Sequence, residues 1–157
     1  MGLRDINGNG VLTGLTNISE VSAFKIIDGK KVPSDGQLLY RGYDVKDLVQ
    51  GSKGEKFIFE EAAYLLLFGK LPSNDELKQF LDIIAECMEL PTNFTRDVIM
   101  KAPSYDIMNS MTRSVLTLAS YDKQAENLEI SNVLRQSIQL ISVFPMLAVY
   151  ALSLIHI

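Results

Sequence analysis

The chain has 157 residues, enough for one domain of average size, of which 47% are hydrophobic and 22% are charged. These fractions are typical of a soluble globular protein, and the net charge of −4 provides no basic surface for nucleic acid or an anionic membrane. A single cysteine excludes an internal disulfide, and the first ten residues contain no apolar signal core. We therefore expect a cytoplasmic protein that binds neither nucleic acid nor a membrane.

The first forty residues predict a small hairpin-like sheet. Gly, Asn and Asp dominate the beginning of the chain, which is typical of a loop or an extended arm. Asp28-Gly29 is a favourable hairpin turn, whereas Pro33 and Gly36 favour irregular structure after it. The expected order is an arm at 2–14, loosely alternating strands at 11–18 and 21–27, an irregular link at 30–37 and a strand at 38–41.

The stretch from Gln37 to Pro72 predicts a strand, a turn and two helices. Asp44 occupies the N-cap position of a short first helix. A second helix is expected at 59–68, because acidic residues lie near its positive end and Gly69 follows its last turn. The physical pattern alone indicates no more than this order of elements.

The same stretch resembles the N-terminal part of the citrate synthase family, bacterial type. The strings YRGYDVKDL and FEEAAYLLLFGKLP carry the resemblance, in this order and at this spacing. The resemblance implies a mainly α fold, with a citrate-synthase-like helical bundle and a small β-hairpin near the N-terminus. The alternative is an unrelated small helical protein that has a strand, a turn and two amphipathic helices.

Three more helices are expected before residue 121. Ser73 and Glu76 form a capping-box pattern that opens the first of them, which ends near Leu90-Pro91. A short helix follows at 93–101, and Ser104 is expected to cap the next helix, with Asp106 in its first turn and its end near 120. The expected buried face of the first comprises Leu77, Phe80, Leu81, Ile84 and Met88, and one side of the third comprises Ile107, Met108, Met111, Val115 and Leu118, with the small or polar Ser110, Ser114 and Thr117 between them.

A long apolar helix is expected from about 129 almost to the end of the chain. It is apolar on nearly every side, so it needs cover that short helices do not supply. Pro145 should kink or break it. A membrane anchor is one alternative, but RQSIQLISVFPMLAVYA resembles a citrate synthase segment. The resemblance implies a homodimer, with helices 106–120 and 129–150 packed antiparallel against their copies.

The last six residues, LSLIHI, do not continue the family pattern. They match the translation of a transposon-end adaptor used in sequencing libraries, so we expect residues 1–151 to be the N-terminal part of the citrate synthase large domain and 152–157 to be non-native. A natural short tail is the alternative. His156, the only histidine, lies in this tail and is excluded from any mechanism.

The resemblance also implies a chemistry. Citrate synthases condense acetyl-CoA with oxaloacetate and hydrolyse the citryl-thioester, using two histidines and one aspartate as acid, base and oxyanion partners. In the family these groups lie further along the chain than Tyr150. We therefore expect no catalytic residue here, no activity of the chain alone, and no metal or redox cofactor, the CoA thioester being a substrate.

Only Arg4 is a candidate ligand-binding residue. It resembles an N-terminal arginine that in some family members reaches the CoA phosphates of the neighbouring subunit, although an arginine on an exposed arm is the simpler interpretation. Arg41 is expected to hold the turn through charge-assisted hydrogen bonds, and Cys87 to be a buried structural thiol.

Two alternative functions stay open. Within the family, 2-methylcitrate synthase uses propionyl-CoA, and the residues that separate the two activities should line an active site formed elsewhere. From another class, the chain fits a stand-alone helical dimerisation or adaptor module. The acyl preference, allosteric behaviour, oligomers beyond a dimer and independent folding are not determined by the sequence.

Overall fold

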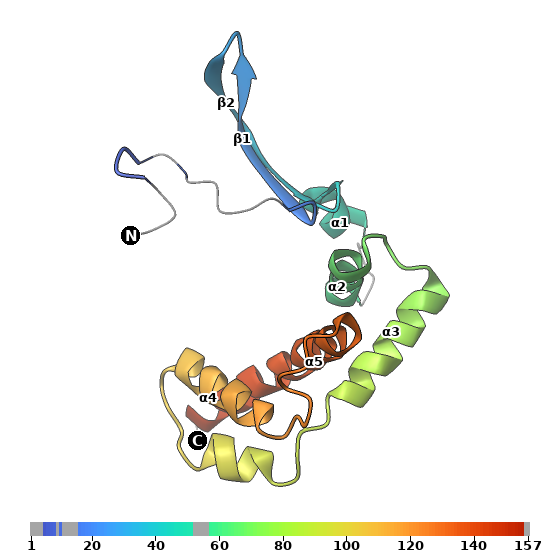
Figure 1. Cartoon of the computed structure of the whole chain (residues 1–157), viewed down its shortest axis with the longest axis vertical. Helices are drawn as coiled ribbons and strands as arrows, with labels where there is room; N and C mark the ends of the chain where they lie inside the picture. The colour runs from blue at the N-terminus through green and yellow to red at the C-terminus, as the bar shows by residue number, and fades with distance from the viewer. Residues whose placement is uncertain (1–4, 9, 11–15, 52–56, 156–157) are drawn as a thin grey trace. The chain divides into compact units, whose positions relative to one another are not determined.

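The computed structural model describes residues 5–8, 10, 16–51 and 57–155, and side chains as far as Ser153. The chain forms two compact units, Met1–Lys78 and Gln79–Ile157, each of which is described by itself. Figure 1 shows a β-ribbon with two short helices in the first unit and a group of helices in the second. Of the strand expected at 11–18, only 16–18 are described, and they are not in a strand.

The first unit contains an antiparallel sheet of three strands in the order β1-β2-β3. The strands are β1 (Ser19–Ile27), β2 (Lys30–Tyr40) and β3 (Tyr43–Asp44). Asp28 and Gly29 join the first two with φ angles of 50° and 74°. A two-residue turn with positive φ at both positions matches the right-handed twist of the strands, so the predicted hairpin turn is confirmed.

The prediction of an irregular link at 30–37 is wrong, because β2 continues through this segment. Ser22 pairs with Gln37 and Phe24 pairs with Pro33, so the register shifts between the two pairs. The extra residues of β2 are accommodated by this β-bulge, which leaves residues unpaired without ending the strand. Pro33, which has no N–H to donate, lies beside the irregularity, where proline is tolerated.

Two short helices follow the sheet, α1 (Val45–Gly51) and α2 (Ile58–Phe68). Asp44 Oδ1 accepts a hydrogen bond from the backbone N–H of Lys46 at 2.9 Å, as its predicted N-cap position requires. Gly69 has a φ of 81° and donates its N–H to the carbonyl of Leu65 at 2.8 Å, which closes the last turn of α2. Asp44 therefore determines where α1 begins, and Gly69 determines where α2 ends.

The helix α3 (Asn74–Cys87) crosses the boundary between the units. Ser73 N–H donates to Glu76 Oε2 at 2.9 Å and Glu76 N–H donates to Ser73 Oγ at 3.3 Å, which confirms the capping box. Phe80 and Ile84 are buried as expected. Met88 was expected on the same face, but the helix ends before it and its side chain is 42% exposed.

The second unit adds a π-helical segment and two helices, η1 (Thr95–Met100), α4 (Ile107–Ala119) and α5 (Ile130–Ile155). Asp106, not Ser104, caps α4, because its Oδ1 accepts from the N–H of Asn109 at 3.0 Å. Ser104 Oγ instead accepts from the N–H of Asp106 at 3.1 Å and shapes the turn before the cap. Asp106, which was predicted to lie in the first turn of this helix, is therefore its N-cap residue.

The core of the second unit lies where η1 and its flanking turn meet α5. Phe94 and Ile99 pack with Val143 and Leu147, and all four are at most 4% exposed. Leu118 of α4 is half-buried against this cluster. Because the cluster joins segments about fifty residues apart, it fixes the two long helices relative to η1.

The long helix α5 continues through Pro145 without a break. By length and composition, Ile130–Ser153 is able to cross a membrane, with a mean hydropathy of 1.4, and it is the one such helix in the described residues. Core helices of soluble proteins pass the same test. Only 28% of the apolar window is buried within the chain, so much of this helix is left uncovered.

Candidate subunit interface

The helix α4 is covered at its small residues rather than at its large ones. Ser110 and Ser114 are 6% and 3% exposed, whereas Met108, which was expected to line the buried side, is 72% exposed. Ser114 Oγ donates to the carbonyl of Ser110 at 2.8 Å, so its hydroxyl is satisfied inside its own helix. Small side chains let a neighbouring helix approach closely. Of the five residues predicted to line the buried side, Met108 alone is exposed, and the other four are half-buried: Ile107, Met111, Val115 and Leu118.

On α5 the buried and uncovered sides are equally distinct. Val143 and Ser142 are 0% and 1% exposed, and Ser142 Oγ donates to the carbonyl of Ile138 at 2.8 Å. Phe144, the residue after Val143, is 40% exposed, and Ile130 at the start of the helix is 88% exposed. The expectation that this helix needs cover on all sides is therefore not met by the chain itself, which shelters one side and leaves an apolar seam.

Both helices carry a largely apolar row at helical spacing whose members are exposed or half-buried, and we call these rows the outward stripes. Successive members lie three or four residues apart, so each row follows one face of its helix. Exposed apolar surface of this kind marks a site of association. The outward stripe of α4 is Met108, Thr112, Leu116 and Ala119, and that of α5 is Ile130, Val133, Ser137, Ile141, Phe144, Ala148 and Leu152.

A groove of about 240 Å³ lies along the meeting line of the two helices. Its lining is mostly aliphatic, with amide and carboxylate groups at one end. The lining comprises Val115, Leu118, Ala119, Asp122, Ala125, Gln136, Gln139 and Leu140.

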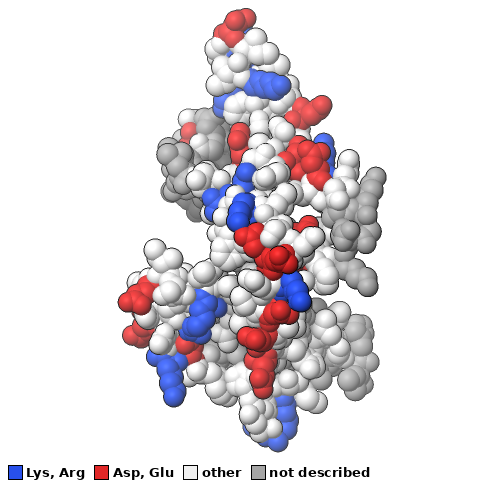
Figure 2. Space-filling model, turned by 90° about the vertical axis from the view of Figure 1, so that its right-hand side faces the viewer, with Lys and Arg blue, Asp and Glu red and all other residues white. Residues whose placement is uncertain are grey.

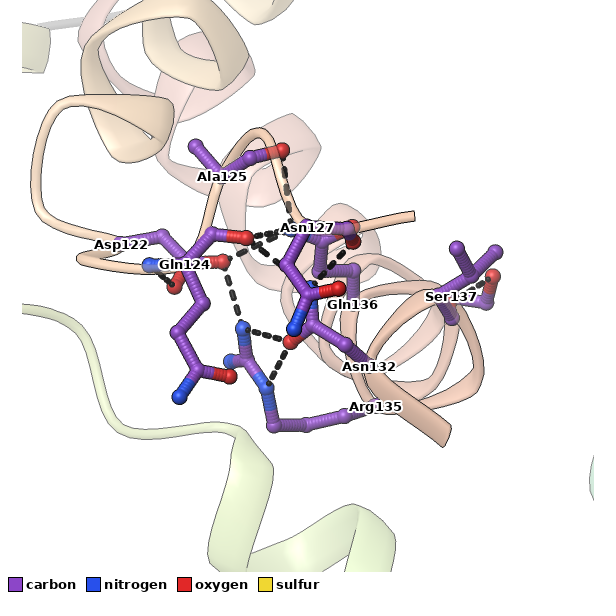
Figure 3. A network of polar contacts seen from close by, with 9 residues as sticks. Asp122, Gln124, Ala125, Asn127, Asn132, Arg135, Gln136 and Ser137 are labelled. Atoms are coloured by element: carbon purple, nitrogen blue, oxygen red, sulfur yellow. Dashed lines mark hydrogen bonds and ion pairs between the residues drawn. The ribbon is translucent and has the colours of Figure 1, made fainter. Parts of the chain in front are cut away.

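A polar network fixes the loop between α4 and α5 against the first turns of α5 (Figure 3). Asn132, which is 5% exposed, donates from Nδ2 to the carbonyls of Gln124 at 2.9 Å and Asn127 at 2.8 Å. Its Oδ1 accepts from Nε and Nη2 of Arg135 at 3.0 and 2.8 Å. The buried amide thus has partners on both sides, as a buried polar group requires.

Asp122 forms the other centre of this network. Its Oδ2 accepts from Arg135 Nη2 at 2.6 Å and from Gln136 Nε2 at 3.0 Å, while its Oδ1 accepts from the N–H of Gln124 at 3.0 Å. The hydrogen bond from Gln136, followed by those from Gln124 and Arg135, lowers the pKa of Asp122 from 3.8 to about 2. The carboxylate is therefore ionised at neutral pH and holds the loop to α5.

The sequence did not predict this network. Asn127, whose Oδ1 accepts from the N–H of Glu129 at 2.9 Å, is a local signal of the start of α5. The pairing of Asp122 with Arg135 spans thirteen residues and depends on how the loop turns. No spacing rule in the sequence indicates it.

The predicted structural role of Arg41 is confirmed in the first unit. Arg41 Nη2 donates to the carbonyl of Leu66 at 3.0 Å and Nη1 donates to Asn17 Oδ1 at 3.2 Å. Arg41 also has a φ of 50°, in the left-handed region, and its N–H donates to the carbonyl of Ile18 at 2.8 Å. It therefore connects the end of β2 with the last turn of α2 and with the chain before β1.

The remaining candidate residues do not form a catalytic constellation in the described part of the chain. Arg4 and His156 lie outside the described residues. Within the described ranges, no group of three or more His, Cys, Asp or Glu side chains is placed to hold a metal ion. Cys87 is a free thiol of intermediate burial, so it is less buried than expected.

The chain is similar in sequence to citrate synthases over most of its length. Residues 6–156 match the family model described as citrate synthase, C-terminal domain. The citrate synthase of Corynebacterium glutamicum is 32% identical over 151 residues, which cover 96% of this chain and 32% of that protein. The citrate synthase of Saccharolobus solfataricus is 34% identical over 114 residues, covering 72% of this chain and 28% of that protein.

Solved structures show the same fold. A ternary complex of Thermoplasma acidophilum citrate synthase with carboxymethyl coenzyme A and oxaloacetate superimposes with a TM-score of 0.71 at 20% identity, over 95% of this chain and 34% of that chain. The citrate synthase of Pyrobaculum aerophilum gives a TM-score of 0.67 at 22% identity. The chain spans about a third of the length of the curated relatives it matches. By its sequence and its fold, this chain belongs to the citrate synthase family.

Proposed function

We propose that this chain contributes part of a citrate synthase, an acyltransferase that condenses acetyl-CoA with oxaloacetate to give citrate and CoA. The observation that carries the proposal is the 32% identity to the Corynebacterium citrate synthase across 96% of the chain. The fold supports it, because the Thermoplasma structure with 95% coverage of this chain is a complex with a coenzyme A derivative and oxaloacetate. The role of these 157 residues in that enzyme is structural, as the helical part that pairs two subunits.

The proposed pairing uses the outward stripes of α4 and α5. A second copy placed by a two-fold axis would cover both stripes at once, since an isologous interface presents the same patch from each side. The aliphatic character of the stripes matches the core of homodimer interfaces, which is more apolar than the general surface. In this arrangement α5 would gain the cover that its own unit does not provide.

We further propose that the chain alone does not catalyse the condensation. Proton removal from the acetyl methyl group requires a positioned base. Stabilising the enol oxygen and polarising the ketone of oxaloacetate each require a hydrogen-bond donor aimed at the oxygen that gains negative charge. Its single histidine is His156, and we assign that residue no catalytic role. We also propose that Arg4 contacts CoA phosphates of a neighbouring subunit, the alternative being an arginine that binds no ligand.

The test uses thiol release with acetyl-CoA and oxaloacetate. The chain alone should give no turnover above background, whereas a chimera in which it replaces the matched 151 residues of the Corynebacterium enzyme should turn over. The unmodified Corynebacterium enzyme is the positive control. Turnover by the chain alone would overturn the proposed division of roles, and a folded but inactive chimera would count against the proposed function.

A second candidate is supported by one relative. The 2-methylcitrate synthase 1 of Corynebacterium glutamicum is 40% identical over 72 residues, which are 46% of this chain. Since 2-methylcitrate synthases use propionyl-CoA, the chimera should be assayed with both acetyl-CoA and propionyl-CoA. A stand-alone dimerisation module is the remaining alternative, and it predicts a soluble dimer whose stability does not increase when the rest of a citrate synthase chain is supplied.

A further inference from the structure

The hairpin of the first unit has two chemically different faces near its turn. In the β1–β2 register, Lys25 lies opposite Val32 and Ile27 lies opposite Lys30. Directly opposite residues of an antiparallel pair share a face, so these four residues form one surface, which we call the lysine face. The other face carries Phe24, Ile26, Lys31 and Pro33.

The described residues of the first unit leave the apolar side chains of the lysine face exposed. Ile27 and Val32 are 54% and 39% exposed, and the ribbon extends away from α1 (Figure 1). Figure 2 shows positively charged side chains just below the tip of the ribbon, whose extreme end is acidic. A ribbon of two strands is only marginally stable by itself in water. A partner that covers the apolar and basic face at its free end would therefore stabilise the ribbon.

The two faces differ in how their lysines are engaged. Lys31 Nζ lies 4.8 Å from the ring centre of Phe24, so this lysine has a cation–π partner inside the hairpin. Among the described residues, neither Lys25 nor Lys30 forms an ion pair. The free positive charge of the hairpin is thus concentrated on the face that also exposes Ile27.

A hollow of matching chemistry lies in the second unit. It encloses about 560 Å³, which is within the range of binding pockets, and lies between the end of α3 and the loop after α4. Its apolar lining comes from Leu90, Pro91, Leu118 and Tyr121, and Glu86 and Glu89 contribute carboxylates. Asp122 and Arg135 also line it and pair with each other, so Glu86 and Glu89 are its two carboxylates that form no ion pair among the described residues.

We propose that the lysine face of one copy docks into this hollow of a second copy. Lys25 and Lys30 would meet Glu86 and Glu89, and Ile27 would enter the apolar lining. The partner is a second copy because the chain itself supplies the complementary charges, Glu86 and Glu89 against Lys25 and Lys30. Such a contact is heterologous, joining two different patches, and it is separate from the isologous pairing of the outward stripes. Its ionic part should weaken as salt rises.

Covalent trapping tests the proposal, because Cys87, the only cysteine, lines the hollow. The variant Ile27→Cys should be joined to Cys87 of another copy by a short bismaleimide. The matched control is Ile26→Cys, the adjacent residue on the opposite face. We expect several-fold more cross-linked dimer from Ile27→Cys, and equal yields from the two variants would overturn the proposal.

An isotope experiment separates contacts between copies from contacts within one copy. Equal amounts of 14N- and 15N-labelled Ile27→Cys protein are mixed before cross-linking, and the linked peptides are identified by mass spectrometry. Docking between copies predicts mixed-label peptides as about half of the linked species. Linked peptides that carry one label only would show a contact within one chain and would overturn the proposal.

Charge-reversal variants, made in the Ile27→Cys protein, test the ionic part of the proposed docking. Lys25→Glu/Lys30→Glu should abolish the cross-link, and so should Glu86→Lys/Glu89→Lys. Mixing the two proteins should restore it, which also shows that both variants fold. The control Lys31→Glu/Lys46→Glu changes the same number of charges away from the lysine face and should cross-link normally. Failure of the mixture to recover, or an equal loss in the control, would contradict the proposed docking.

Discussion

The two units of the chain are stabilised by different means. Among the described residues of the first unit, Leu65 is the one side chain that is fully buried, and its elements are joined by turns, caps and the contacts of Arg41. The second unit has a packed cluster around Phe94 and Leu147 and a polar network around Asn132. The first therefore depends on local backbone geometry and on the hydrogen bonds of Arg41, and the second on packing between segments far apart in sequence.

The largest expected effect is in the core of the second unit. Leu147→Ala should lower the free energy of unfolding by about 2–5 kcal/mol, because it leaves a cavity beside Phe94 and Val143. Urea denaturation followed by far-UV circular dichroism measures this change. The control Leu128→Ala truncates a side chain that is 84% exposed and should change stability by less than about 0.5 kcal/mol. Equal effects would show that this cluster is not the core.

The next effect concerns the polar network. Asn132→Ala removes the partner of two backbone carbonyls and of Arg135, so it should cost about 1–3 kcal/mol. Hydrogen exchange should show the largest gain between residues 122 and 129. The exposed helix residue Asn109 provides the control Asn109→Ala, with a small expected effect. If Asn132→Ala is as well tolerated as its control, the network does not hold the loop.

A smaller effect is expected in the hairpin of the first unit. Gly29 has a φ of 74°, so Gly29→Ala places a side chain in the left-handed region at a cost of about 1–2 kcal/mol. NMR chemical shifts should report the loss of pairing between β1 and β2. Gly36→Ala is the matched control, since no other group lies within 4 Å of the added atom and its φ is not positive. A hairpin that tolerates both changes equally would contradict the assigned turn.

The smallest effect is a dependence on pH. The pKa of Asp122 is lowered in the folded chain to about 2 from 3.8, so its contribution to stability is present above about pH 4 and is lost as pH falls towards about 2. The difference in urea midpoint between the wild type and Asp122→Asn should therefore shrink over that interval. A constant difference from neutral pH to about pH 2 would rule out the ionised carboxylate as its source.

The comparison of the units also explains what sequence reasoning could predict. Asp28-Gly29, the Ser73–Glu76 capping box and Gly69 each act within a few residues, and all were located correctly. The bulge that keeps β2 continuous through Pro33 depends on its pairing partner and was missed. Long-range features are invisible to local rules because they require the position of a second segment.

The α4–α5 pair shows the same limit at the candidate interface. Periodicity identified both helices, but it assigned the large apolar residues to the inside. The structure buries Ser110 and Ser114 more deeply than the predicted Val115 and Leu118, which are half-buried, and it leaves the predicted Met108 exposed. Hydrophobicity cannot distinguish a residue covered by its own chain from one covered by a partner. That ambiguity is itself the reason why the outward stripes are candidates for subunit pairing.

The central claim is that these stripes are covered by a second copy of the chain. Sedimentation equilibrium in about 0.5 M NaCl tests it, because salt at this concentration screens charge contacts such as the hairpin docking. The account predicts a dimer for the wild type and a monomer with unchanged helicity for Leu116→Asp/Phe144→Asp. A wild type that stays monomeric at every concentration, or a variant that dimerises equally well, would contradict it.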